Sequence, residues 1–277
     1  MLNKVKDICK GRGPLLLALS GGPDSMALYH LLKSSGHPFE VAHIDHGWRE
    51  ESREEAAHLE RSVEVPFHLK RLEKGEKNIE DTARKGRHSF FQEVLKNRSL
   101  EGVLLAHHAD DLAETVLKRL LEGTRLTKLV GLEEVVEVEG MTFLRPLLSF
   151  RKKQIVSWLD EQKIQYFVDS HSSDLRSRMR QMMLPFLSEQ LGKEVVPSLC
   201  RIAEDAKELR EDLDRFMLKR AVSEFFEGKK VAISRPTLDS VCRHLEKGSA
   251  HKTLRIGKGE AIIDRNILTY NKRIDEE

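Results

Sequence analysis

Apolar and polar positions alternate along the first half of the chain in a way that predicts strands separated by helices. Short apolar runs predict strands at 15–19, 39–44, 66–69, 102–106 and 141–144, and the first of them, which ends in a Gly-rich turn, is expected to be buried. Between them, apolar residues recur at helical spacing, over 25–32, 52–63, 79–96 and 110–121. Strands that alternate with helices are typical of βαβ units and of a mostly parallel sheet.

Helical spacing dominates the second half of the chain. Ser149 is the expected N-cap of a helix over 150–163, and a longer helix is expected over 196–226. Short strand-like pieces at 231–233 and 261–263 accompany at least one further helix. Because the pattern changes and 277 residues exceed one average domain, we expect an α/β fold in two parts. These parts are a Rossmann-like, parallel-sheet domain and a smaller, mainly helical domain, over residues 1–190 and 191–277.

Composition narrows the class of protein further. Charged residues make up 33% of the chain and hydrophobic residues 39%, as expected for a globular protein with a well-solvated surface. No apolar run approaches the roughly 20 residues of a membrane span, and no apolar stretch near Met1 indicates a secretory signal. The spacing of Cys9, Cys200 and Cys242 argues against a disulfide framework or a Cys-x-x-Cys metal site. We therefore expect a cytoplasmic protein without a membrane partner, and the net charge of +2 by itself indicates no particular partner.

The strongest functional signal lies between the first strand and the next helix, in Ser20, Gly21, Gly22, Pro23, Asp24 and Ser25. A strand, a Gly-rich loop and a helix N-terminus direct backbone N–H groups at an anion. The glycines let a phosphate approach the backbone, and the serine hydroxyls can donate hydrogen bonds to it. Asp24 would repel a bare phosphate, so its presence indicates a Mg²⁺ ion between carboxylate and phosphate.

Two widespread phosphate-binding motifs do not match this segment. It has no lysine at the position that the Walker motif requires, and it lacks the third glycine of the dinucleotide fingerprint. An ordinary strand-to-helix turn is the alternative interpretation. Agreement at all six positions after a buried strand favours a nucleotide-binding loop instead.

A polar cluster at 43–49 follows the second strand. Alternation puts His43 and Asp45 on one face of that strand. Because ligands of parallel sheets bind at the carboxyl ends of the strands, these side chains are candidates for the nucleotide pocket. A metal site built from them together with His46 is the alternative.

A second polar cluster, at 107–115, follows the fourth strand and opens a helix. His107, Asp111 and Glu114 stand three or four residues apart, so one helix face can carry all three. Acidic residues also favour the first turn of any helix. That preference explains one aspartate, but it does not explain histidines and a glutamate at the ligand-binding end of a sheet.

Basic residues provide candidates for phosphate contact. Arg84 and Arg87 lie about one turn apart on a helix whose other face is apolar, where they either contact a substrate or face solvent. Residues 145–180 hold twice as many basic as acidic residues. The candidates for nucleic-acid or phosphate contact in that stretch are Arg145, Arg176, Arg178 and Arg180.

Taken together, these motifs resemble the tRNA(Ile)-lysidine synthetase family of the ATP pyrophosphatase, or PP-loop, superfamily. The resemblance runs in order over most of residues 12–190, and its most specific part is the His-His-x-Asp-Asp-x-x-Glu-Thr pattern of 107–115. Further matches stand at 78–80, 83–87, 123–124, 145–148 and 176–185. The sequence departs from the family at Trp48, where leucine is usual, and at Ser177, where asparagine is usual.

The resemblance implies an adenine-nucleotide alpha-hydrolase-like fold for a PP-loop ATP-binding catalytic domain over 1–190. Residues 191–277 would form a helical tRNA-binding or accessory domain. The implied enzyme is a ligase that uses ATP to adenylate the wobble cytidine of the isoleucine tRNA with a CAU anticodon. Free L-lysine then displaces AMP to give lysidine, and pyrophosphate is the other product. A homodimer is also compatible with the resemblance.

The resemblance also implies roles for individual residues. The implied ATP-binding residues are the six loop residues, His43 and Asp45, with Asp24 as the Mg²⁺ ligand. The implied catalytic residues are Asp24, His107, Asp111, Glu114, Arg84 and Arg87. Of these, the two carboxylates on the helix would bind the lysine ammonium and take its proton. The implied contacts with tRNA or phosphate are Arg145, Arg176, Arg178 and Arg180.

Three other functions stay open at this point. A related PP-loop enzyme could thiolate tRNA, although such enzymes usually carry a cysteine set that this chain lacks. A non-catalytic ATP-binding module would need the loop but not the His, Asp and Glu face. An RNA-binding accessory protein would need the basic stretch but not the loop.

Overall fold

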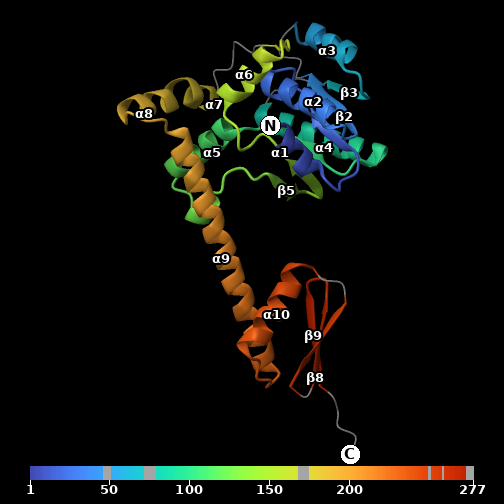
Figure 1. Cartoon of the computed structure of the whole chain (residues 1–277), viewed down its shortest axis with the longest axis vertical. Coiled ribbons are helices and arrows are strands. Elements are labelled where there is room, and N and C mark those ends of the chain that lie inside the picture. The colour runs from blue at the N-terminus through green and yellow to red at the C-terminus, as the bar shows by residue number, and fades with distance from the viewer. Residues whose placement is uncertain (46–50, 72–78, 168–174, 249–250, 258, 273–277) are drawn as a thin grey trace, which may run out of the picture. The chain divides into compact units, whose positions relative to one another are not determined.

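A computed structural model describes residues 1–45, 51–71, 79–167, 175–248, 251–257 and 259–272 (Figure 1). The chain divides into two compact units, Met1–Glu204 and Asp205–Glu277, and each is described by itself. The division lies beyond the boundary expected after residue 190. The reason is packing, because Leu199 and Ala203 are buried in a cluster that belongs to the first unit.

The first unit contains a six-stranded sheet with the strand order β3-β2-β1-β4-β6-β5. Five of its strands are parallel, namely β1 (Leu15–Ala18), β2 (Phe39–Asp45), β3 (Phe67–Arg71), β4 (Val103–Leu104) and β6 (Met141–Leu144). They coincide with the five predicted strands, so the expected parallel sheet is confirmed. The sixth, β5 (Val135–Val138), pairs antiparallel with β6 at the edge of the sheet and was not predicted.

The helices of this unit precede, connect or follow these strands (Figure 1). They are α1 (Leu2–Cys9), α2 (Pro23–Ser35), α3 (Glu51–Ser62), α4 (Ile79–Arg98), α5 (Ala109–Leu121), the 3₁₀ turn η1 (Leu126–Lys128), α6 (Lys152–Glu161), α7 (Leu175–Arg178), the π-helical segment η2 (Met179–Met183) and α8 (Leu184–Gln190). The prediction of Ser149 as the N-cap of α6 is wrong. Residues 145–150 form successive turns instead, in which the Phe150 N–H donates a hydrogen bond to the Leu147 carbonyl. The helix therefore begins only at Lys152.

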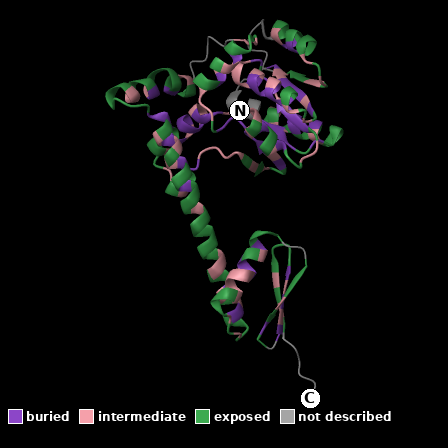
Figure 2. Cartoon of the chain, viewed as in Figure 1, coloured by how far each residue is buried: buried purple, intermediate pink, exposed green. Residues whose placement is uncertain are grey.

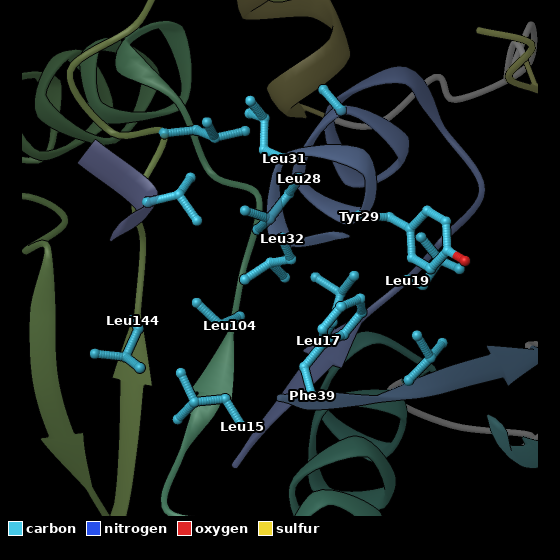
Figure 3. Close-up of a cluster of buried hydrophobic side chains, with 14 of the residues drawn as sticks. Leu15, Leu17, Leu19, Leu28, Tyr29, Leu31, Leu32, Phe39, Leu104 and Leu144 are labelled. Atoms are coloured by element: carbon cyan, nitrogen blue, oxygen red, sulfur yellow. The ribbon is translucent and has the colours of Figure 1, made fainter. Parts of the chain in front are cut away.

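The apolar residues of the inner strands β1, β2, β4 and β6 are mostly buried, on both faces of the sheet. Leu15 and Leu17 of β1 pack with Leu28 of α2 on one face (Figure 3). Leu16 points to the other face, where it packs in a cluster with Phe91 of α4. Because successive strand side chains point to opposite faces and helices cover both, the strands read as continuous apolar runs. Figure 2 shows the resulting buried layer along the strands and the inner sides of the helices.

The second unit combines helices with a small antiparallel sheet. It contains most of α9 (Val196–Gly228), α10 (Arg235–Glu246) and the strands β7 (Lys252–Ile256), β8 (Gly259–Asp264) and β9 (Ile267–Lys272). The strand-like piece at 261–263 lies in β8, but the one expected at 231–233 is not a strand. That segment leads directly into α10, whose N-cap Ser234 accepts a hydrogen bond from the Thr237 N–H. Among the helices that the structure describes, none has both the length and the apolar character that crossing a membrane requires.

Candidate active site

The site lies where the strand order of the first unit reverses. From β1 the chain runs outward to β2 and β3, whereas β4 lies on the other side of β1. A crevice opens at the carboxyl ends of two such strands. Here it is a cavity of about 980 Å³, between the loop that follows β1 and the segment that follows β4. Its polar lining consists of Ser20, Asp24, Ser25, Arg87, His88, His107, Asp111, Arg145 and Arg176.

The loop after β1 is shaped by its own hydroxyl groups. Ser25 Oγ donates a hydrogen bond to the Gly22 carbonyl at 3.0 Å and accepts one from the Ser20 N–H at 3.2 Å. Because its single proton is used, the Ser20 hydroxyl must be the donor in the 3.0 Å contact between the two Oγ atoms. Ser20 Oγ in turn accepts the Gly22 N–H at 3.3 Å. The loop is therefore preformed for a ligand.

Both the backbone and the packing of this loop favour glycine at position 21. Its φ of +85° lies in the left-handed region. A Cβ atom at this position would lie 2.7 Å from Cδ2 of Phe167 and 3.1 Å from Cδ1 of Leu59. The Gly21 carbonyl also accepts the Phe167 N–H at 3.0 Å. The loop is thus closely packed against the segment that follows α6.

Asp24, in the first turn of α2, has two unlike carboxylate oxygens. Oδ2 accepts a hydrogen bond from Lys152 Nζ at 2.5 Å. Oδ1 is buried, makes no hydrogen bond with any residue that the structure describes, and lies 3.6 Å from His108 Nε2. A buried carboxylate oxygen without a hydrogen-bond partner beside a phosphate loop fits a Mg²⁺ ion, which binds through one or two carboxylates together with substrate phosphates.

A metal site made by protein side chains alone does not fit what the structure describes. Within the described part of the chain, no group of three or more His, Cys, Asp or Glu side chains could hold a metal ion. This finding does not test the alternative metal site of His43 and Asp45 with His46, because one of its three members is not among the described residues. His46 itself, with residues 47–50, lies outside the described residues.

His108, which the sequence analysis did not single out, is surrounded by carboxylates. The side chain is 1% exposed, and Nε2 lies 3.5 Å from Asp111 Oδ2 and 3.6 Å from Asp24 Oδ1. Nδ1 lies 3.6 Å from Asp110 Oδ2. His108 is the N-cap residue of α5 and has an extended backbone. Its ring lies against the first turn of α5 and also reaches Asp24 of the phosphate loop. The ring therefore bridges the carboxylate of that loop and those of α5.

His107 is held in one tautomer. Nδ1 accepts a hydrogen bond from Arg145 Nε at 3.2 Å, so the proton of a neutral ring resides on Nε2. Burial lowers the pKa of His107 to about 4, and Arg145 acts in the same direction, although Asp111 opposes both. Arg145 is itself buried and donates to the Glu133 carbonyl at 2.8 Å. His107 is thus a neutral side chain at the cavity wall, and Arg145 orients it.

Asp111 and Glu114 lie side by side on α5, as predicted, and share one cation. Asp111 Oδ2 accepts the His108 N–H at 2.9 Å, which caps the helix. Asp111 Oδ1 accepts Arg180 Nη2 at 3.0 Å. The Glu114 carboxylate, 2% exposed, accepts Arg180 Nε at 2.6 Å and Nη2 at 3.2 Å. Burial raises the pKa of Glu114, although Arg180 opposes the rise.

A further ion-pair network joins α5 to α6. The Asp110 carboxylate accepts hydrogen bonds from Arg151 at 3.1 and 3.2 Å and from the Lys152 N–H at 2.8 Å. Burial alone would raise the pKa of Asp110, but these hydrogen bonds outweigh it and hold the pKa below its ordinary value. Arg151 also pairs with Glu194 at 2.7 Å. The first turns of the two helices are thereby locked together beside the phosphate loop.

Other predicted residues lie in different positions. Arg87 and Arg176 line the cavity, whereas Arg178 is exposed and is not part of its lining. His43 is buried, and its Nδ1 donates a hydrogen bond to the Leu19 carbonyl at 2.7 Å beneath the phosphate loop. Asp45 is also buried, 3.5 Å from Arg71 Nε. Arg84 belongs to α4, but its side chain lies outside what the structure describes. ATP contact by His43 and Asp45 stays a prediction.

Comparisons with known proteins show which family this chain resembles. A family model described as the PP-loop domain matches residues 1–187. The tRNA(Ile)-lysidine synthase of Chlamydia pneumoniae is 38% identical, over 92% of this chain and 92% of its own length. That of Chlamydia muridarum is 45% identical over 72% of this chain and 65% of its own length. That of Chlamydia trachomatis serovar D is 37% identical over 84% of this chain and 85% of its own length.

A solved structure supports the fold. The U34-tRNA thiolase NcsA from Methanococcus maripaludis, described with its [4Fe-4S] cluster, superposes with a TM-score of 0.60 over 75% of this chain and 78% of its own. At 17% identity this likeness concerns the fold alone. The expected PP-loop fold and the expected family are both confirmed. The chain belongs to the tRNA(Ile)-lysidine synthase family of PP-loop proteins.

Proposed function

We propose that this chain is an ATP-dependent ligase that converts the wobble cytidine of the CAU-anticodon isoleucine tRNA to lysidine. The observation that carries the proposal is that one cavity is lined by both the phosphate-loop carboxylate Asp24 and the α5 carboxylate Asp111. His108 lies between the two. Family membership supports the same reaction, since the relatives carry the name of this activity.

In the first half-reaction the loop after β1 would bind the phosphates of ATP. Backbone N–H groups at the N-terminus of α2 suit this purpose. Asp24 would hold a Mg²⁺ ion, which supplies charge neutralisation for a leaving pyrophosphate when bound. Arg176 and Arg87 line the same cavity, where they can neutralise the phosphates and the adenylated cytidine. The 2-carbonyl oxygen of cytidine attacks the α-phosphate, and pyrophosphate leaves.

In the second half-reaction the ε-amine of free lysine displaces AMP. The lysine amine has a solution pKa of about 10.4, so freeing it at pH 7 requires about 4–5 kcal/mol. Asp111 and Glu114 already accommodate the guanidinium of Arg180, so their position suits an organic cation. We propose that they bind the lysine ammonium and that one of them takes its proton. The neutral His107, with its proton on Nε2, can donate a hydrogen bond to a substrate oxygen.

Incorporation of labelled lysine into RNA tests the proposal. The protein would be incubated with ATP, Mg²⁺, radiolabelled lysine and unmodified CAU-anticodon isoleucine tRNA. We expect incorporation that requires ATP and is absent with methionine tRNA of the same anticodon. Pyrophosphate release that depends on tRNA, without lysine incorporation, would favour another nucleophile such as the sulfur of a thiolation reaction. If neither lysine incorporation nor pyrophosphate release occurs, the proposed reaction is wrong.

Two substitutions locate the reaction. Asp24→Ala and Asp111→Ala should each abolish lysine incorporation while the far-UV circular dichroism stays unchanged. Activity near that of the unmodified protein in either variant would contradict the corresponding assignment.

A further inference from the structure

A lysine from a distant part of the sequence reaches the phosphate loop. Lys152 Nζ lies 2.5 Å from Asp24 Oδ2, although 128 residues separate the two in the chain. Both side chains are partly accessible, with 30% and 24% of their surface exposed. Lys152 therefore stands at the border between the loop and the solvent, where a ligand can reach its amine.

The position of Lys152 is fixed by the start of α6. Its backbone N–H donates a hydrogen bond to Asp110 Oδ2 at 2.8 Å, and Arg151 holds the same carboxylate. The next residue differs, because Lys153 points to Glu194 at 2.7 Å and is 66% exposed. Adjacent lysines thus have different environments, and only Lys152 contacts the phosphate loop.

The phosphate loop lacks a positive charge of its own, which the Lys152 amine can supply. Residues 19–25 contain no Lys or Arg, and Asp24 adds a negative charge beside the place where the phosphates would bind. An ammonium group has three donors, and the structure describes one side-chain bond for it, to Asp24. The remaining donors can therefore bind phosphate oxygens while the bond to Asp24 persists.

We infer that Lys152 is a phosphate-binding residue that contacts the pyrophosphate portion of ATP. It takes the place of the lysine that a Walker loop carries within its own sequence. Without nucleotide it neutralises Asp24, and with nucleotide it bridges Asp24 and the phosphates. The inference rests on the ATP use of the proposed function, but it does not depend on which nucleophile follows.

Binding of inorganic pyrophosphate, ATP and AMP to variants tests the inference. Calorimetry in EDTA, without Mg²⁺, excludes effects on metal affinity. We expect Lys152→Met to weaken pyrophosphate and ATP binding about tenfold or more, to leave AMP binding unchanged, and to be largely restored by Lys152→Arg. Lys153→Met is the matched control and should bind all three ligands normally. Unchanged pyrophosphate binding in Lys152→Met, or an equal loss of AMP binding, would overturn the inference.

A double variant separates contact from simple charge balance. If Lys152 only neutralises Asp24, then adding Asp24→Asn to Lys152→Met restores pyrophosphate binding, and the inferred contact is wrong. If Lys152 contacts the phosphates, the double variant stays weak. Should Lys152→Met fail to fold, reductive methylation of the unsubstituted protein gives the answer. Pyrophosphate, but not AMP, should protect Lys152 while Lys153 stays reactive, and the absence of protection would contradict the contact.

These outcomes are distinct from failure of the proposed function. A protein that binds ATP through Lys152 but incorporates no lysine would overturn the lysidine reaction and leave this inference intact. If the unsubstituted protein makes lysidine but the Lys152→Met variant binds pyrophosphate normally, the proposed function holds and this inference is wrong.

Discussion

The guanidinium of Arg180 forms two hydrogen bonds with the carboxylate of Glu114, of 2.6 and 3.2 Å. A third bond, of 3.0 Å, joins it to Asp111. The two carboxylates that we propose for the lysine ammonium are therefore already paired with a cation of the protein. Arg180 lies in η2, a π-helical segment, and such segments are frequent at functional sites. A substrate ammonium must displace this guanidinium or share the carboxylates with it.

Removing the resident cation should strengthen binding of free lysine. Because Arg180→Gln leaves both carboxylates without their present partner, lysine no longer competes with a tethered guanidinium. We expect a several-fold lower Kd for lysine without tRNA, measured by equilibrium dialysis. Arg178→Gln is the control, since Arg178 is an exposed arginine two residues away, and it should leave the Kd unchanged. Weaker lysine binding in Arg180→Gln would mean instead that Arg180 positions the carboxylates for the substrate.

Glu114 and Asp110 should affect stability with opposite dependence on pH. The pKa of Glu114 is raised, chiefly by burial, so the folded state holds this proton more tightly than the unfolded state. The contribution of the protonated Glu114 to the free energy of unfolding is therefore lost as the pH rises from the ordinary carboxyl pKa of about 4.3 through the raised pKa. The pKa of Asp110 is lowered, so its contribution is present above about pH 4 and is lost as pH falls through the lowered value.

Urea unfolding from pH 3 to 7 measures both effects. Glu114→Gln should gain stability relative to the unsubstituted protein as the pH rises from about 4.3 through the raised pKa of Glu114. Asp110→Asn should be less stable than the unsubstituted protein above about pH 4, and this difference in unfolding free energy should shrink as the pH falls through the lowered pKa of Asp110. Parallel curves for the unsubstituted protein and either variant would contradict the environment that the structure gives that carboxyl group.

His107 should stay neutral throughout the physiological range. Its pKa is lowered to about 4, chiefly by burial, so the unfolded state binds this proton more readily between pH 6.5 and 4. The contribution of His107 to the free energy of unfolding is therefore fully present above pH 6.5 and falls, by about 3–3.5 kcal/mol in all, as the pH drops through 4. Ring carbon–proton NMR spectra, assigned with His107→Asn, should show no titration of His107 between pH 7 and 5.5. A midpoint near 6.5 would show that the ring is solvated.

The sequence predicted the parts of this site that depend on local signals. The phosphate loop follows from glycines and hydroxyls after an apolar run, and the α5 face follows from spacing along one helix. Because β1 and β4 are parallel neighbours, both clusters had to meet at one edge of the sheet. The strands 15–19 and 102–106 were enough to place both clusters at the ligand-binding end of the sheet, but the adjacency of β1 and β4, which brings Asp24 near Asp111, comes from the structure.

The pairs that neutralise these carboxylates could not be predicted in the same way. Lys152 and Asp24 lie 128 residues apart, and Arg180 and Glu114 lie 66 apart, so each pair depends on how helices pack. The turns at 145–150, misread as the start of a helix, set where Lys152 stands. His108 was overlooked for a related reason, because its approach to Asp24 depends on the neighbouring positions of β1 and β4 in the sheet.

A substitution at Gly21 can separate backbone strain from close packing in the phosphate loop. Gly21 and Gly36 have similar left-handed φ values, +85° and +73°. A Cβ at Gly36 would have open space, whereas one at Gly21 would lie 2.7 Å from Phe167. Alanine at either position should cost about 1 kcal/mol of folding free energy through strain. Gly21→Ala should cost more, because the Phe167 ring must also move.

The effect on ligand binding should differ even more than the effect on stability. Moving Phe167 disturbs the loop that it packs against, so Gly21→Ala should lose most of its affinity for ATP and pyrophosphate, measured by calorimetry. Gly36→Ala, which ends α2 far from the loop along the helix, should bind both ligands normally. Equal unfolding free energies and equal ATP affinities in the two variants would contradict a loop held in shape by Phe167. Gly21→Ala combined with Phe167→Ala relieves the contact and should recover part of the ATP affinity.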